Sequence, residues 1–208
     1  MGVDIYRYLD HDLPTDNIDS FVNELKKRVN SENIVLETVE CVPKWENKKD
    51  DVWYIFIDPC GIYNIFHNEL VFSVYKKALE VRYVEIEGKE DSSRWPFLLN
   101  YFESEIEYGK KWINGTIKFL KQNFVPIFHS TKLLVLADNR SYRHEFLDDC
   151  IEYDGKTIDE AIELNKKFDV PCKVYKNEEA IGIKEYDYWD GEIGPIFLFD
   201  LKGTLDFL

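Results

Sequence analysis

The stretch that most constrains the fold is Lys132–Asp138, KLLVLAD, in which five consecutive apolar residues are bounded by charged residues. An uninterrupted apolar run of this length is typical of a strand covered on both faces, as in the interior of an α/β sheet. The residues that follow predict a turn and a helix beginning near Ser141. Ligands in open α/β sheets bind just beyond the carboxyl ends of strands, so Asp138, Arg140 and His144 are the first candidate site residues.

Hydrophobic periodicity predicts the other elements. Alternating or apolar segments predict strands at 3–9, 33–42, 52–58, 70–75, 79–86, 169–175 and 195–200, with a weaker pattern at 181–185. Apolar residues at helical spacing predict helices from Thr15 or Asp16 to Val29, over 98–124 as one helix or two and ending at Val125–Pro126, and from the capping box Thr157–Glu160 to Phe168.

These elements predict a mixed α/β sheet in a single domain over residues 1–208. The N-terminal half is antiparallel-rich, because the strands at 70–75 and 79–86 are joined only by a short turn. In the C-terminal half, the strand at 132–138, two helices and the strand at 169–175 predict a β-α-α-β crossover unit with parallel strands. The segment 88–93, GKEDSS, is the one connector at which the domain would be subdivided.

The chain is strongly acidic, with 40 acidic and 26 basic residues and a formal net charge of -14. Such a charge repels nucleic-acid phosphate and anionic lipid and favours cationic partners. No apolar run approaches the ~20 residues that span a bilayer, and the amino terminus lacks the apolar core of a signal peptide. We therefore expect a basic protein partner, and neither nucleic acid nor a membrane.

The four cysteines, at 41, 60, 150 and 172, contain no C-x-x-C pair and no metal-finger spacing. In a chain of this size such cysteines are typical of the reduced thiols of a cytoplasmic protein. The sequence also has no G-x-S-x-G and no G-x-G-x-x-G motif, so neither a serine-nucleophile elbow nor a dinucleotide-binding loop is indicated.

Carboxylates follow several predicted strands. Strand-end carboxylates can converge on a divalent metal, and their oxygen ligands would suit Mg or Mn. The strand ends carry Asp10, Asp58, Asp138 and Asp200, and the candidate metal ligands are Asp10, Asp12, Asp58 and Asp138. The alternative is that these residues begin turns, where an aspartate bonds nearby backbone N–H groups.

The segment His144–Asp148 places a histidine and an acid four residues apart on one predicted helix. It differs from a helical zinc motif because Asp148 stands where a second histidine is needed, so a solvated His144–Asp148 pair is expected instead. Arg140 and Arg143, near the start of this helix, would either bind an anion or neutralise neighbouring acids.

The segment 185–192, EYDYWDGE, combines four acids and three aromatic residues with no base. Aromatic faces beside carboxylates bind ammonium or guanidinium groups, although a buried hairpin tip would account for the same residues. The candidate binding residues are Glu185, Tyr186, Asp187, Tyr188, Trp189 and Asp190.

Two functional hypotheses follow. The first is a non-enzymatic protein-interaction module that binds a basic partner, as a bacterial immunity protein or an inhibitor does. The second is a metal-assisted hydrolase or transferase, with Asp138, His144, Arg140 and His11 as its candidate catalytic residues. The two differ in geometry, because the second requires Asp10, Asp58 and Asp138 to lie at the same edge of the sheet.

Overall fold

The computed structural model of the protein describes residues 5–31, 35–42, 52–58, 69–84, 117, 120–122, 124–137, 142–181 and 196–202. The strands are β1 (Ile5–Asp10), β2 (Val35–Val42), β3 (Val52–Asp58), β4 (Glu69–Val74), β5 (Ala78–Val84), β6 (Lys132–Ala137), β7 (Val174–Lys176) and β8 (Ile196–Asp200). The helices are α1 (Ile18–Ser31), α4 (Val125–Phe128), α5 (Tyr142–Glu152), α6 (Ile158–Asn165) and α7 (Glu178–Ile181).

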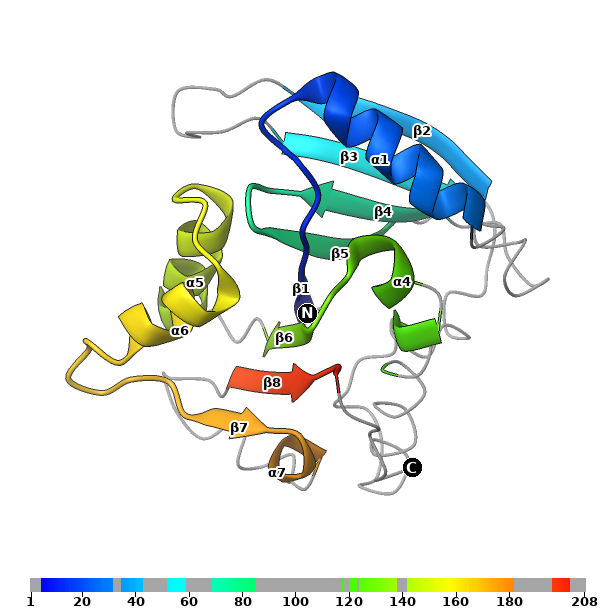
Figure 1. The fold of residues 1–208 in the computed structure, drawn as a ribbon. Coiled ribbons are helices and arrows are strands. Elements are labelled where there is room, and N and C mark those ends of the chain that lie inside the picture. The colour runs from blue at the N-terminus through cyan, green and yellow to red at the C-terminus, as the bar shows by residue number, and fades with distance from the viewer. Residues whose placement is uncertain are drawn as a thin grey trace.

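The described strands form one sheet in the order β2-β3-β4-β5-β1-β6-β8-β7, with helices packed around it (Figure 1). A mixed α/β fold is confirmed. Every neighbouring pair is antiparallel except β7 and β8, which are parallel. The predicted antiparallel pairing of β4 with β5 is also confirmed, and the N–H of Tyr75 closes their turn by donating to the carbonyl of Ala78 at 2.9 Å.

The predicted crossover between β6 and β7 is wrong in its direction. β6 is antiparallel to β8, and β8 is parallel to β7, so β6 and β7 run in opposite directions with β8 between them. The order β6-α5-α6-β7 along the chain is as predicted. The two helices therefore lead from β6 to an antiparallel strand at the sheet edge, and the parallel pair is formed by β7 and β8 instead.

Two local predictions also need correction. The cap of α1 is Asn17, whose Oδ1 accepts from the N–H of Ser20 at 3.0 Å, rather than Thr15 or Asp16. Ile181 ends α7, so the strand predicted at 181–185 does not begin at that residue, and 182–185 lie outside the described residues. The helix predicted to end at Val125–Pro126 does stop there, since helical residues 120–122 are followed by a turn at Phe124; Val125–Pro126 then begins the short helix α4, where proline is tolerated because the first N–H groups of a helix have no intrahelical partner. The helix pattern at 98–116 and the connector at 88–93 lie outside the described residues.

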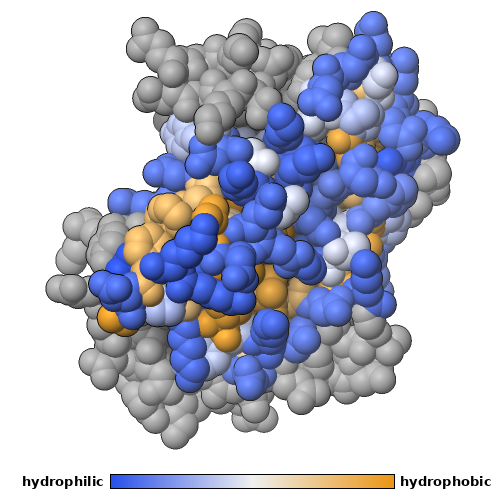
Figure 2. Space-filling model, turned by 60° about the vertical axis from the view of Figure 1, so that its left-hand side comes forward, coloured by the Kyte–Doolittle hydropathy of each residue, from blue (hydrophilic) through white to orange (hydrophobic). Residues whose placement is uncertain are grey.

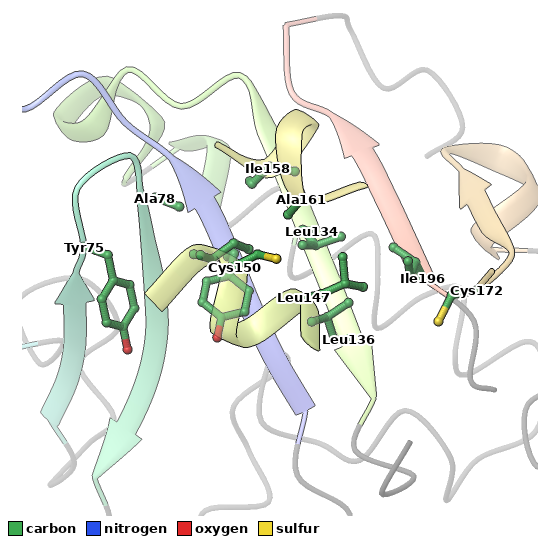
Figure 3. Close-up of a cluster of buried hydrophobic side chains, with 12 residues drawn as sticks. Tyr75, Ala78, Leu134, Leu136, Leu147, Cys150, Ile158, Ala161, Cys172 and Ile196 are labelled. Atoms are coloured by element: carbon green, nitrogen blue, oxygen red, sulfur yellow. The ribbon is translucent and has the colours of Figure 1, made fainter. Parts of the chain in front are cut away.

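The apolar run of β6, which was predicted to lie inside the sheet, is buried on both faces. Leu134 and Leu136 point to one face and Leu133 to the other, because side chains alternate along a strand. All three are at most 1% exposed, and Val135 is half-buried. The first face is covered by α5 and α6, whose Leu147, Cys150, Ile151, Ile158 and Ala161 close over Leu134, Leu136 and Ile196 (Figure 3).

The other face is covered by α1 and α4. Phe72 of β4 contacts the rings of Phe124 and Phe128, with centroids 4.9 and 5.0 Å away. α1 buries Phe21, Leu25 and Val29 and joins α4 through Arg28, which donates to the carbonyl of Ile127 at 2.9 Å. The sheet is thus a central layer between two helical layers (Figure 1).

Candidate functional site

The carboxyl end of β1 holds three of the candidate residues, Asp10, His11 and Asp12. The carboxylate of Asp10 accepts hydrogen bonds from the backbone N–H groups of Thr131 and Lys132, at 2.6 and 2.7 Å. These are the N–H groups at the start of β6. Asp10 therefore holds two strands together through bonds to residues 121 and 122 positions away, which is neither the metal-ligand role nor the local turn role considered from the sequence.

Both ring nitrogens of His11 have backbone partners. Nδ1 accepts from the N–H of Leu13 at 3.1 Å, so Nε2 carries the proton and donates to the carbonyl of Tyr75 at 2.9 Å. Burial lowers the pKa of His11, because desolvation disfavours the imidazolium. His11 is a neutral structural histidine in this arrangement and does not present a free nitrogen to a substrate.

Asp12 bridges α1 and α4. It accepts from Nη1 of Arg28 at 2.6 Å and from Nδ1 of His129 at 2.8 Å. Burial acts to raise the pKa of Asp12, but these hydrogen bonds outweigh it and lower the pKa. His129 is 54% exposed and stands in a left-handed backbone conformation with φ of 53°. The sequence offered no signal that His129 would meet Asp12, which is 117 positions away.

The strand-end carboxylates do not all lie on the same side of the sheet, that is, along the same row of strand ends. Asp10 is opposite Ala78, whereas Asp58 is connected through Ile57, Leu70 and Tyr83 to the far end of β5. Three strand spacings across the sheet and about six residues along the strands separate them by roughly 24 Å. Asp138 lies outside the described residues, but Ala137 before it pairs with Ile5, at the opposite end of β1 from Asp10.

Asp200 is at the same edge as Asp10, since it pairs with Lys132, and its carboxylate accepts from the N–H of Lys202 at 2.9 Å. Within the described part of the chain, no three histidine, cysteine, aspartate or glutamate side chains are grouped so as to hold a metal ion. The antiparallel pairing explains the separation, because successive strands send their carboxyl ends to opposite edges.

The residues at the start of α5 are buried rather than presented to a ligand. His144 is 3% exposed, so the predicted solvated pair with Asp148 is wrong. Arg143 is 8% exposed, and its guanidinium lies 3.6 Å from the ring centroid of Phe168, in a cation–π contact. Arg140 lies outside the described residues. α5 is turned so that the side expected to be solvated faces the core.

Two carboxylates of α5, Asp148 and Glu152, meet two buried tyrosines of the sheet. The hydroxyl of Tyr8 in β1 donates to Asp148 and also lies 3.4 Å from Glu152. The hydroxyl of Tyr75 donates to Glu152 and lies 3.4 Å from Oε2 of Glu80 in β5. We call these five residues the carboxylate–tyrosine cluster; it links α5 to β1 and to the β4–β5 hairpin.

The carboxylate–tyrosine cluster shifts the acidity of its members. Burial, followed by the charge of Glu152, raises the pKa of Asp148 to about 8. Arg7, which precedes Tyr8, is 8% exposed; burial lowers its pKa to about 10, and the charge of Glu80 opposes that shift. Asp148 is therefore mostly protonated at neutral pH, whereas Arg7 remains charged. This role of Asp148 could not be predicted, because nothing in the sequence indicates which strand α5 covers.

The outer side of α5 and α6 is acidic. Over residues 142–169, seven carboxylates are exposed, against two exposed lysines. They are Glu145, Asp149, Asp154, Asp159, Glu160, Glu163 and Asp169, and we call them the acidic face. Asp159 pairs with Lys132, and Glu163 pairs with Lys166 at 2.6 Å. Glu160 completes the predicted capping box with Thr157, which is confirmed.

Hydrophobic side chains interrupt this acidic face. Figure 2 shows the side of the molecule that carries α5 and α6, where hydrophilic residues surround a smaller hydrophobic area. Phe146, Ile162 and Leu164 are partly buried against the core on these helices, and Val170 just after them is 57% exposed. An apolar area bordered by polar residues is a common feature of protein-binding surfaces.

The acidic aromatic segment 185–190 lies outside the described residues, so its six candidate binding residues remain a prediction. None of the helices in the described parts of the chain has the length and apolar character needed to cross a bilayer. Comparison with known family models, with curated proteins and with solved structures finds no match to this chain.

Proposed function

We propose that the chain is a non-enzymatic protein-interaction module that binds a basic protein partner, of the immunity-protein or inhibitor type. The observation that carries the proposal is the acidic face, where seven exposed carboxylates and two exposed lysines occupy α5, α6 and their flanking turns. A surface of this sign steers a cationic partner and raises its association rate, and it disfavours nucleic acid. The segment 185–190 would add aromatic anchors to the same kind of surface.

The net charge of -14 supports the same proposal. The positions of Asp10 and Asp58, which end their strands on opposite sides of the sheet, do not support the alternative of a metal-assisted hydrolase or transferase that uses Mg or Mn. Its two candidate bases are also poorly placed for catalysis. Both ring nitrogens of His11 are hydrogen-bonded to the backbone, and the side chain of His144 is 3% exposed.

We also propose a cytoplasmic location. The support is the state of the two described cysteines, Cys150 and Cys172, which are both free and buried. Burial raises the pKa of each thiol to about 11, so neither is activated for exchange or metal binding at neutral pH.

The proposal is tested by capture from native lysate, followed by mass spectrometry of the bound proteins. The face variant is Glu145→Gln with Asp149→Asn and Glu163→Gln, which removes three charges from the acidic face. A control variant, Asp16→Asn with Asp19→Asn and Glu179→Gln, removes three exposed charges from other elements and has the same net charge. We expect the wild type and the control to recover the same basic protein, and the face variant to lose it.

The salt dependence of capture tests whether charge drives it. Interactions between exposed charges are largely screened beyond the Debye length, which is about 10 Å at 0.1 M salt and shortens as salt is added, so capture should weaken from 50 to 300 mM. Recovery of no basic protein by the wild type, or equal losses by the face variant and the control, would contradict the proposal.

A further inference from the structure

We propose that the exposed side of α6 is a self-complementary surface, through which two copies of the chain pair in antiparallel orientation about a two-fold axis. Three exposed acids lie along the helix and two exposed lysines follow its last residue: Asp159, Glu160, Glu163, Lys166 and Lys167. We call these five residues the α6 strip. A surface that is acidic at one end and basic at the other matches a second copy of itself turned by 180°.

The spacing of the charged residues places them on one side of the helix. Residues three, four and seven positions apart share a face of an α-helix, as Asp159, Glu163 and Lys166 do. The opposite side carries the buried residues of α6, which are Ile158, Ala161 and Asn165. Because an α-helix rises about 1.5 Å per residue, the charge of the strip changes sign within about 10 Å.

Within one copy, the order of charges is partly explained by the helix itself. Acids near the start and bases near the end complement the helix dipole. Lys166 also pairs with Glu163 at 2.6 Å, but these side chains are 62% and 67% exposed, and such a surface pair contributes little to stability. The side chain of Lys167 makes no ion pair with another residue in the described part of the chain, so a carboxylate from a second copy would displace nothing there.

Val170 is the feature that the helix dipole does not explain. It is 57% exposed, more than any other large hydrophobic residue of the described part of the chain. It lies in the connection from α6 to β7, which extends away from the sheet before returning to β7 (Figure 1). In an antiparallel pair this connection would lie over the start of the other copy's α6, beside the half-buried Ile162. Val170 thus adds an apolar contact to each group of ion pairs.

The net charge of -14 on each copy opposes the pairing. At 0.15 M salt the Debye length is about 8 Å, so charges far from the contact are largely screened, whereas ion pairs across it act within about 4 Å. The contact is also small, because a helix of eight residues and one connection bury less than a standard interface. We therefore expect a weak dimer, with a dissociation constant of about 10–100 µM.

Pairing would cover Asp159, Glu160 and Glu163 of the acidic face. A basic partner would then compete with the second copy, and this consequence rests on the proposed function. The dimer itself does not, because it is measured without any partner. A chain that binds a basic protein and never dimerises would overturn the dimer alone.

The test is sedimentation velocity of the full chain at about 0.15 M salt, over roughly 5 to 500 µM. We expect wild type to pass from monomer to dimer in this range. Lys166→Glu with Lys167→Glu should raise the dissociation constant about tenfold or more, because like charges then meet at both ends of the contact. The matched control, Lys26→Glu with Lys27→Glu, changes two adjacent exposed lysines of α1 and should stay within about twofold of wild type.

A charge swap tests which surfaces meet. Asp159→Lys with Glu163→Lys should not dimerise alone, although it reduces the net negative charge and with it the overall repulsion. Mixed with the Lys166→Glu and Lys167→Glu variant, it should form a mixed dimer, because both ends of the contact then join opposite charges. Wild type that stays monomeric throughout, an equal loss in the α1 control, or a mixture without mixed dimers would overturn the proposal.

Melting temperatures show whether each variant is folded. Should Asp159→Lys with Glu163→Lys not fold, Val170→Asp tests the same contact at an exposed position outside the helix. It should raise the dissociation constant about tenfold while leaving the melting temperature unchanged. A dimer that Val170→Asp does not weaken would overturn the proposal.

Discussion

The hydroxyl of Tyr8 in β1 donates a hydrogen bond to the carboxylate of Asp148 in α5, a residue 140 positions further along the chain. The contact joins the strand at the middle of the sheet to the helix that covers it. It also places the carboxyl of Asp148 in a buried position near Glu152, and burial, followed by the charge of Glu152, raises the pKa of Asp148. The packing of α5 on the sheet and the pKa of Asp148 therefore depend on the same contact.

The first prediction concerns stability and pH. The pKa of Asp148 is raised to about 8 in the folded chain, above its unfolded value, so the folded state binds the extra proton. The stability that this proton provides is complete below pH 4 and is lost as the pH rises to about 8, at up to about 1.4 kcal/mol per pH unit. Asp148→Asn should therefore be more stable than wild type at pH 8 and similar to it near pH 4.

Urea unfolding of both proteins at several pH values measures this difference, and taking the difference cancels the other titrating groups. Curves that run parallel over the whole range would show that Asp148 is not protonated in the folded chain.

The second prediction concerns the interior strand. Leu134 is 0% exposed and contacts the α5 and α6 layer, so Leu134→Ala leaves a cavity that the helices cannot readily fill. We expect a loss of about 2–5 kcal/mol in the free energy of unfolding. Val135→Ala is the matched control, because Val135 is only half-buried and should lose less. Equal losses for the two variants would contradict the layered arrangement.

Much of the fold could be predicted because its signals are local. Alternating and apolar runs predicted β1 to β6 and β8 to within a few residues, and the Thr157 capping box predicted the start of α6. The direction of β7 could not be predicted in this way. The crossover prediction placed β7 directly beside β6 and parallel to it. That position is occupied by β8, the last described strand in the chain, so β7 pairs with β8 instead.

The candidate site was harder to predict, because it depends on which residues meet across the sheet. Asp10, Asp58 and Asp138 all follow apolar strands, and only the antiparallel pairing shows that Asp10 and Asp58 belong to opposite edges. Asp148 and Glu152 look like solvated helix residues in sequence. Their role follows from the orientation of α5, which the apolar Leu147, Cys150 and Ile151 fix against β1 and β6.

The third prediction concerns Asp10. Its carboxylate accepts the N–H groups of Thr131 and Lys132, and Asp10→Ala leaves both without that acceptor. We expect a loss of about 1–3 kcal/mol in the free energy of unfolding, measured by thermal or urea unfolding. Asp10→Asn keeps one acceptor oxygen and should lose less. A wild-type melting temperature that rises markedly with added Mg²⁺, and an Asp10→Ala variant that lacks this rise, would instead support metal binding.

The fourth prediction concerns the segment 185–190, outside the described residues. If its rings and carboxylates bind a cationic side chain together, Trp189→Ala combined with Asp190→Ala should weaken capture of a basic partner. The effect should be larger at low salt, and the melting temperature should stay nearly unchanged. A large drop in melting temperature with partner binding intact would assign these residues to the core.

The central claim is that the acidic face binds a basic protein, and the most direct measurement is the affinity of the recovered partner for three forms of the chain. Titration calorimetry at 50 mM salt would compare the wild type, the face variant and the control variant of equal net charge. Loss of three complementary charges should weaken binding by the face variant about tenfold or more, and the control should remain within about twofold of wild type. Equal affinities for all three, or equal losses for both variants, would contradict the claim.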